Sequence, residues 1–479
     1  MNLEKELKEY LGFDEFRPGQ KEVIETALAK QNCFAMLPTG TGKTICYQLA
    51  GHLMDGLVLI VSPLLSLMQD QMERMRAHGE KRVAALNSFL KREEKGQILA
   101  SIHLYKFIFL SPEMLNNETV KNLLLKQKIS LFVIDEAHCI SQWGHDFRPD
   151  YLMLGRFIQE AKFPVTMVLT ATATKKVRAD ILTQLHLTDC AQIVYSVNRP
   201  NISLQVEKFS NQHVKKDRLY ELVRKLQTPG IIYFSSKKLA ESTAHELSEI
   251  AELRVAYYHG DMDTEDRIII QQQFVYGQLD VICATSAFGM GIDKADIRYV
   301  IHYHMPADLE AYLQEIGRAG RDGEESVAIL LYANGDEFIQ MQLADQDIPD
   351  ANLMNLTTEQ RKTLPETEQR FIDYYQRSGL STKELTDKMD YRKKWKRANL
   401  QQFIGYLHTT DCRRNYILRY FEEAPLEVTP ENCCDLDGAE IINFEKRAKI
   451  KTKRNSNMGS LFSLFTAIVL LLRNLTKTM

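Results

Sequence analysis

A phosphate-binding loop is the part of this chain whose residue types and spacing most clearly suit chemistry. Residues 37–44 read LPTGTGKT and lie between an apolar stretch and a helix-like stretch. In this context Gly40 and Gly42 let backbone N–H groups turn toward an anion, and the following helix N-terminus favours negative charge. Lys43 would reach the β- and γ-phosphates of ATP, and Thr44 would bind Mg²⁺. The sequence therefore predicts an ATP and Mg²⁺ site that includes Thr39, Gly40, Thr41, Gly42, Lys43 and Thr44.

Two neighbouring acids supply what a phosphate loop needs for hydrolysis. Asp135 and Glu136 follow the apolar run Ser130–Ile134, and the C-terminal edge of a parallel sheet is where α/β proteins place their ligands. Asp135 would hold the magnesium ion, and Glu136 would orient and deprotonate the attacking water. The alternative is a strand end that carries two solvated acids, which the phosphate loop upstream disfavours.

An arginine pair and an aromatic segment complete a nucleotide site. Arg318 and Arg321 are three residues apart, so on a helix they would share one face. An arginine delivered to the γ-phosphate raises the rate on the order of a thousandfold or more. Upstream of the phosphate loop, Phe13 offers a ring for a purine, and the Gln20 amide can match an adenine edge. Taken alone, the arginines suit an ordinary protein surface and the upstream segment suits a helix cap.

The loop after the acids combines aromatic and cationic side chains. Trp143, Phe147 and Arg148 stand a few residues beyond Glu136. Stacking on a base contributes roughly 1–3 kcal/mol, comparable with the mean of about 1.4 kcal/mol for one DNA stacking step. This proximity predicts that nucleic-acid contact is coupled to hydrolysis.

Short apolar strands alternate with helical stretches, which predicts an α/β fold with two parallel sheets in tandem. The first series of expected strands is 33–37, 57–61, 107–110, 131–134 and 165–169, and the second is 202–206, 231–234, 255–258, 281–284, 299–303 and 327–332. The segment Asn-Arg-Pro-Asn at 198–201 is the expected hinge, because a proline biases the preceding residue away from helix. Beyond residue 343 the pattern becomes helical. We expect domains at 1–200, 201–343 and 344–440, followed by a basic and apolar tail at 441–479.

Composition fits a globular protein that stays inside the cell. Hydrophobic residues make up 44% and charged residues 26% of 479 residues. With 60 Lys plus Arg against 63 Asp plus Glu, a nucleic-acid surface must be a local patch. The N-terminus is charged and the cysteines are mostly scattered in apolar strands, which predicts a cytoplasmic location. The apolar run Leu461–Leu472 is shorter than the roughly 18–20 residues of a membrane span, so we expect no membrane partner, an interfacial helix being the minor alternative.

Taken together, these motifs resemble the RecQ family of superfamily-two DNA helicases. The loop 141–149, SQWGHDFRP, after DEAH is the most specific element, and 169–173, 259–262 and 284–294 also match. The resemblance implies two RecA-like domains and an ATP-dependent helicase that moves 3′ to 5′ on single-stranded DNA in repair and recombination. It places Phe13, Arg17 and Gln20 around the adenine. It also implies that DNA, single-stranded or as tailed duplex, contacts Trp143, His145, Phe147 and Arg148.

The third region departs from the four-cysteine zinc site of that family. Cys412, Cys433 and Cys434 match three of the cysteines, and Asp437 stands where the fourth is expected. Three thiolates and a carboxylate can complete a tetrahedron for Zn²⁺, although structural zinc sites mostly use sulfur and imidazole. The alternative is a degenerate site that is held by packing alone.

The region after Asp437 is short for the family. A winged-helix domain needs about 100 residues and an HRDC domain about 80, whereas residues 438–479 number 42. We therefore expect both to be missing or reduced, and unwinding to be weaker. Three alternatives follow: a DNA-stimulated ATPase or translocase with weak unwinding, a nucleic-acid-binding adaptor with a dead ATPase, and an RNA helicase.

Overall fold

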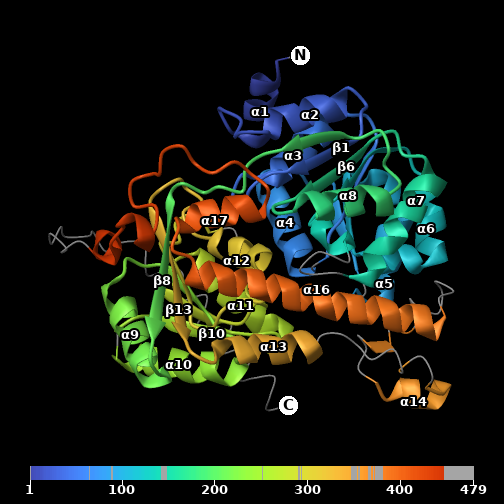
Figure 1. Cartoon of the computed structure of the whole chain (residues 1–479). Coiled ribbons are helices and arrows are strands. Elements are labelled where there is room, and N and C mark those ends of the chain that lie inside the picture. The colour runs from blue at the N-terminus through green and yellow to red at the C-terminus, as the bar shows by residue number, and fades with distance from the viewer. Residues whose placement is uncertain are drawn as a thin grey trace, which may run out of the picture.

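The computed structural model contains two parallel-sheet units and a third, helical unit that contacts both (Figure 1). The structure describes residues 2–63, 65–87, 90–141, 148–250, 252–289, 292, 294–346, 353, 356–364, 368–369, 372 and 381–446. The expected apolar tail Leu461–Leu472 and most of the basic tail therefore lie outside the described residues. None of the described helices is long and apolar enough to cross a membrane.

The first unit is a seven-stranded parallel sheet in the order β3-β4-β2-β5-β6-β1-β7. Its strands are β1 (Cys33–Met36), β2 (Leu57–Val61), β3 (Val83–Leu86), β4 (Phe107–Leu110), β5 (Ile129–Ile134), β6 (Thr166–Thr170) and β7 (Ala191–Val194). Its helices are α1 (Leu3–Leu11), α2 (Gln20–Leu28), α3 (Lys43–Leu53), α4 (Leu65–Ala77), α5 (Arg92–Ala100), α6 (Glu118–Leu125), α7 (Met153–Ala161) and α8 (Lys175–Gln184). Short 3₁₀ turns are η1 (Ile102–Leu104), η2 (Pro112–Asn116), η3 (Ala137–Ile140) and η4 (Pro149–Leu152).

The second unit is a six-stranded parallel sheet in the order β10-β11-β9-β12-β13-β8. Its strands are β8 (Ile202–Phe209), β9 (Gly230–Tyr233), β10 (Val255–Tyr258), β11 (Val281–Ala284), β12 (Tyr299–His302) and β13 (Ser326–Ala333). Its helices are α9 (Gln212–Lys225), α10 (Lys237–Ile250), α11 (Thr264–Val275), α12 (Leu309–Ile316) and α13 (Asp336–Gln346).

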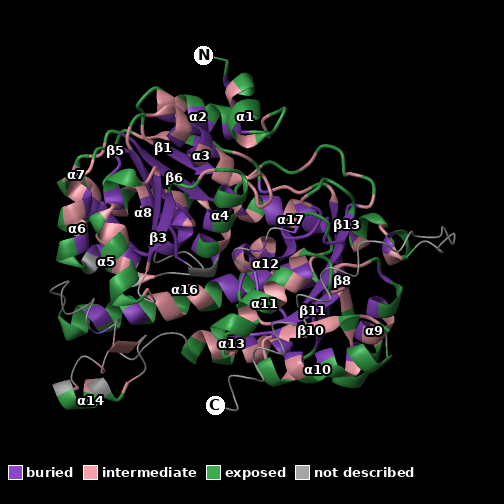
Figure 2. Ribbon diagram, turned by 180° about the vertical axis from the view of Figure 1, so that it is seen from behind, coloured by how far each residue is buried: buried purple, intermediate pink, exposed green. Residues whose placement is uncertain are grey.

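The sheets form because helices cover both of their faces. Strands β1 to β6 are buried at every position, as expected for parallel sheets whose crossovers are helical. Figure 2 shows this buried interior inside a shell of exposed helical faces. The predicted α/β class with two tandem sheets is confirmed. Two strands, β3 and β7, were absent from the sequence prediction; β7 is a half-exposed edge strand with one buried residue, Ile193.

The third unit is mostly helical and packs on the second sheet. It comprises α14 (Thr358–Lys362), α16 (Thr382–His408), α17 (Arg413–Tyr420), η6 (Asp435–Asp437) and η7 (Ile441–Phe444). Helix α16 begins at a capping box in which Ser381 and Glu384 satisfy each other's backbone N–H groups. It contacts α12 and α13, and Figure 1 shows it crossing beneath the first unit. At the far side, the cysteine segment pairs with the edge strand β8 through Leu204 and Cys434.

Candidate active site

The phosphate loop lies between β1 and α3, in a cleft bordered by both sheet units. Gly40 and Gly42 have φ values of 89° and 75°, in the region that side chains other than glycine rarely adopt. A Cβ at Gly40 would come 3.0 Å from Arg321 Cγ, and one at Gly42 would come 3.1 Å from Gln20 Nε2. Glycine at these two positions therefore lets the second unit and helix α2 close on the loop.

A single cavity of about 430 Å³ collects the expected nucleotide residues from both units. It is lined by Phe13, Arg17, Gln20, Thr39, Gly40, Gly42, Lys43, Thr44, Asp135, Glu136, Arg318 and Arg321, among others. The first ten come from the first unit and the two arginines come from the second. Thr41 is not among the lining residues; its hydroxyl donates to the Pro38 carbonyl at 2.8 Å, which stabilises the turn of the loop.

The two acids sit at the end of β5 in different environments. Asp135 is 6% exposed, and its carboxylate accepts the Glu136 N–H at 2.9 Å. Burial, and then the neighbouring Glu136, raise the pKa of Asp135 to about 7. Glu136 has a φ of 49°, a backbone conformation that costs free energy and that tends to persist at functional sites. A buried carboxylate of this kind, next to Lys43 and Thr44 in one cavity, suits a bound cation.

The two arginines reach the cavity by a route that differs from the expected one. Helix α12 ends at Ile316, so Arg318 and Arg321 lie in the turns that follow it. The prediction that they share a helix face was wrong, because Gly317 and Gly320 end the helix, Gly320 with a φ of 56°. Arg318 donates to the Gly289 carbonyl, and Arg321 donates to the Ile292 carbonyl at 2.7 Å. These backbone contacts fix both side chains at the border of the cavity.

Residues expected around the adenine also contact the phosphate loop. Arg17 donates to the Gly40 carbonyl. Gln20 Nε2 donates to the carbonyls of Thr41 and Gly42 at 2.6 and 3.1 Å, and its Oε1 accepts the Arg17 N–H at 2.8 Å. Gln20 thus shapes the loop in this structure, and its pairing with adenine stays a prediction. Phe13 is 48% exposed beside the cavity, which leaves its ring free to stack.

Positive charge is concentrated around the loop. Burial, followed by repulsion from Arg321 and Arg17, lowers the pKa of Arg199 to about 10. A group of arginines that repel one another is stabilised by a polyanion between them. The electrostatics therefore suit the triphosphate of a nucleotide.

The aromatic loop is described only in part. Trp143, His145 and Phe147 lie outside the described residues, so their expected DNA contacts stay predictions. Arg148 is half-buried and donates to the Pro63 carbonyl at 2.8 Å. Tyr151 O–H, just beyond, donates to the Asp135 carbonyl at 3.3 Å. The end of the loop is thus physically attached to the acid strand.

The four expected zinc ligands converge. The Sγ atoms of Cys412, Cys433 and Cys434 and a carboxylate oxygen of Asp437 all lie within 4.8 Å of one another. Cys412 and Cys433 Sγ are 3.7 Å apart, close to the roughly 3.8 Å edge of a tetrahedron with 2.3 Å Zn–S bonds. Contact with Cys433 is the largest influence on Cys434 and lowers its pKa to about 7. The donor set and its spacing therefore fit Zn²⁺.

Comparison with known proteins agrees with this geometry. Residues 17–180 match the DEAD/DEAH box helicase model, 214–323 match the helicase conserved C-terminal domain, and 368–437 match the RecQ zinc-binding model. The probable ATP-dependent DNA helicase RecS of Bacillus subtilis is 45% identical over 93% of this chain and 94% of its own length. The chain belongs to the RecQ family of ATP-dependent DNA helicases.

Other relatives and solved structures are consistent with that membership. The ATP-dependent DNA helicase RecQ of Synechocystis is 33% identical over 91% of this chain and 98% of its own length. The fold resembles that of the Mycobacterium smegmatis helicase Lhr bound to single-stranded DNA and AMP-PNP, with a TM-score of 0.59, 22% identity, and coverage of 74% of this chain and 52% of that one. Saccharomyces cerevisiae Dbp5 bound to RNA and ADP BeF3 gives a TM-score of 0.58, 23% identity, and coverage of 71% and 89%. The protein is therefore an ATP-dependent DNA helicase with a RecQ-type zinc-binding region.

Two functionally placed residues were missed by sequence reasoning. Arg199, within the expected hinge, reaches the phosphate loop, and Arg414 reaches the hinge from the third unit. The available signal was the position of Arg199 in a segment that joins two domains. Nothing in the local sequence indicates its partners, which lie more than a hundred residues away along the chain.

Proposed function

We propose that this helicase couples ATP hydrolysis to 3′-to-5′ movement along single-stranded DNA and separates tailed duplexes during DNA repair and recombination. The supporting observation is the shared cavity, to which the first unit contributes the phosphate loop and acids and the second unit contributes two arginines. Because the site includes residues from both units, nucleotide binding and hydrolysis would change how they contact each other. Family membership supplies the direction and the DNA substrate of this proposal.

In the proposed site, each residue has a separate task. Lys43 and the loop N–H groups hold the phosphates, while Thr44 and Asp135 hold Mg²⁺. Bound Mg²⁺ would neutralise phosphate charge and orient the triphosphate. Glu136 positions and deprotonates the attacking water, and Arg318 and Arg321 stabilise charge that develops in the transition state. Phe13 stacks on the adenine, with Arg17 beside it.

DNA contact is assigned to the loop that ends at Arg148. We propose that Trp143, His145, Phe147 and Arg148 touch the strand and report its presence to the acids. The contact from Tyr151 to the Asp135 carbonyl supports this coupling. Replacing Arg148 with Ala would then reduce DNA-stimulated ATP turnover more than basal turnover, whereas an equal loss of both would identify the loop as structural.

Zn²⁺ is proposed to bind Cys412, Cys433, Cys434 and Asp437. The fit of the sulfur spacing to a tetrahedron supports this proposal. It would be tested by metal analysis of purified, folded protein. A zinc content near zero in such a sample would favour the degenerate site instead.

The proposed activity is tested by strand displacement on duplexes with a 3′ or a 5′ single-stranded tail. Displacement confined to the 3′-tailed duplex supports the proposal. DNA-stimulated ATP turnover without displacement at saturating protein would identify a translocase instead. The same assay with RNA tails separates a DNA helicase from an RNA helicase.

A further inference from the structure

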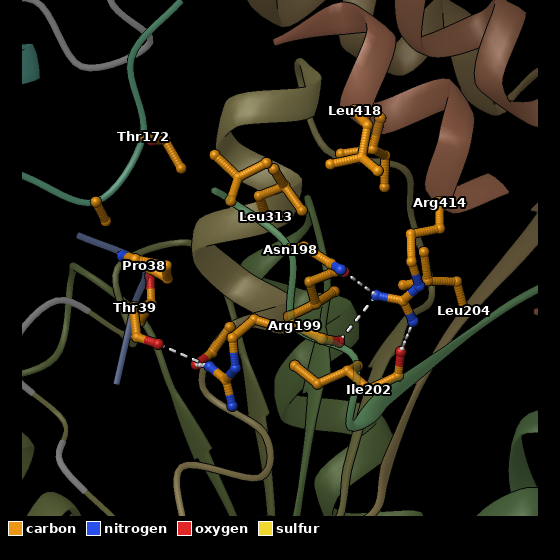
Figure 3. A pocket seen from close by; sticks show the side chains of 15 residues that line it. Pro38, Thr39, Thr172, Asn198, Arg199, Ile202, Leu204, Leu313, Arg414 and Leu418 are labelled. Atoms are coloured by element: carbon orange, nitrogen blue, oxygen red, sulfur yellow. Dashed lines mark hydrogen bonds between the residues drawn. The ribbon is translucent and has the colours of Figure 1, made fainter. Parts of the chain in front are cut away.

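The arginine of the hinge joins the two halves of the ATP site. Arg199 Nη1 donates to the Thr39 carbonyl at 2.7 Å and to the Gly317 carbonyl at 3.1 Å. Its Nη2 donates to the carbonyls of Ala319 and Gly320 at 2.9 and 2.7 Å. Four backbone acceptors from two different units thus surround one planar guanidinium group (Figure 3). Thr39 belongs to the phosphate loop, and the other three flank Arg318.

A second arginine holds the hinge from the third unit. Arg414, 4% exposed at the start of α17, donates through Nη1 to Asn198 Oδ1 and the Arg199 carbonyl at 2.8 and 2.9 Å. Its Nη2 donates to the Ile202 carbonyl at 2.6 Å, and its Nε contacts Cys433 Sγ at 3.3 Å. Figure 3 shows the two arginines on either side of residues 198–202. The cysteine segment, the hinge and the phosphate loop are therefore connected by consecutive side-chain contacts.

The other end of α17 contacts the same stretch of chain. Glu423 accepts the Val197 N–H at 3.0 Å and the Ser196 hydroxyl. A cavity of only about 30 Å³ remains where the three units meet, lined by Thr39, Arg199 and Arg414 among others. That volume has room for about one water molecule. The junction is close-packed, so displacing the hinge would displace its neighbours.

We propose that Arg199 and Arg414 are positioning residues, through which the third unit sets the distance between the phosphate loop and the turns that carry Arg318 and Arg321. The inference rests on the proposed ATP site. Arginine suits the task because its fixed fork serves several acceptors at once, whereas lysine places all its donors on one nitrogen. Replacing Arg199 or Arg414 with Lys keeps the charge and removes the geometry. Since misplacement of about 1 Å can cost on the order of a hundredfold in rate, ATP turnover should fall while nucleotide binding is kept.

The neighbouring Arg413 provides a matched control. It is 3% exposed, and it donates to the Tyr406 carbonyl and to Asp435, all within the third unit. Arg413→Lys therefore perturbs the same unit without touching the hinge. Asn198→Ala is a milder variant that removes one acceptor of Arg414, and it keeps the test valid if Arg414→Lys does not fold.

The experiment measures kcat and KM for ATP with saturating single-stranded DNA, equilibrium binding of a fluorescent ATP analogue, zinc content and the unfolding midpoint. We expect Arg199→Lys and Arg414→Lys to lower kcat by about 10- to 100-fold, with analogue affinity within about threefold and zinc content unchanged. Asn198→Ala should lower kcat by several-fold. Arg413→Lys should keep kcat within about twofold of the parent. Since the two arginines act in series, the double Lys variant should lose about as much as the worse single variant.

Three results would overturn the proposal: a parental kcat in Arg414→Lys or in Asn198→Ala, an equal loss in Arg413→Lys, or a double variant whose loss is the product of the two single losses. Lys43→Ala separates this from failure of the ATP site. If Lys43→Ala keeps full turnover, the site itself is misassigned. If Lys43→Ala is inactive and Arg199→Lys is unaffected, only the positioning role is refuted.

Discussion

Replacing Asp135 with Asn should stabilise the nucleotide-free protein in a manner that depends on pH. The folded-state pKa of Asp135 is about 7, against an ordinary value of 3.8. Below pH 3.8 the carboxyl is protonated in both states and costs nothing. Between 3.8 and 7 the unfolded chain loses its proton first, so the folded state is progressively penalised. Above pH 7 the penalty reaches about 4 kcal/mol, from a pKa difference of about 3 at 1.36 kcal/mol each.

Unfolding of the parent and Asp135→Asn, without nucleotide or Mg²⁺, measures this penalty directly. At pH 5.5 the variant should be more stable by about 2 kcal/mol, and at pH 8 by about 4 kcal/mol. The increase of about 2 kcal/mol corresponds to roughly 4–8 °C in the unfolding midpoint of a domain of about 200 residues. Adding ATP and Mg²⁺ at pH 8 should then stabilise the parent more than the variant. A stability difference that does not change between pH 5.5 and pH 8 would refute the reasoning.

Three further predictions concern the other site residues. Lys43→Ala should lower ATP turnover by at least about 100-fold, as measured by phosphate release, and normal turnover would contradict the site. Phe13→Ala should weaken ATP binding by about 1–3 kcal/mol with kcat little changed; an altered kcat at unchanged KM would argue against stacking. Cys434→Ser should abolish bound zinc and lower the unfolding midpoint, whereas Cys190→Ser, outside the cluster, should change neither; retained stoichiometric zinc in Cys434→Ser would contradict the ligand assignment.

Features set by short stretches of sequence could be predicted, because their cause is local. The phosphate loop follows from glycines with positive φ between a buried strand and a helix, and most strands follow from apolar runs. Strand β3 was missed because its four residues, Val83–Leu86, are a short run that gains stability only by pairing with β4. Strand β7 pairs only with β1, at the sheet edge.

Features set by distant partners could not be predicted. The turns that carry Arg318 and Arg321 have a helix-like pattern, yet Gly320 and the acceptors at Gly289 and Ile292 impose another path. The Gln20 amide suits adenine by its chemistry, but it bonds to the phosphate loop about twenty residues away. The contacts of Arg199 depend on how two sheets are placed relative to each other, which no local pattern specifies.

The pairing of Cys434 with Leu204 also has a consequence for solubility. Strand β8 is at the edge of the second sheet, and an uncovered edge strand presents N–H and C=O groups on which another chain can add. The Leu204 N–H donates instead to the Cys433 carbonyl at 3.0 Å, so the cysteine segment covers part of this edge. Removing the metal would loosen that cover and expose the edge. Zinc would thus protect the helicase from self-association through its second sheet, independently of any role in DNA binding.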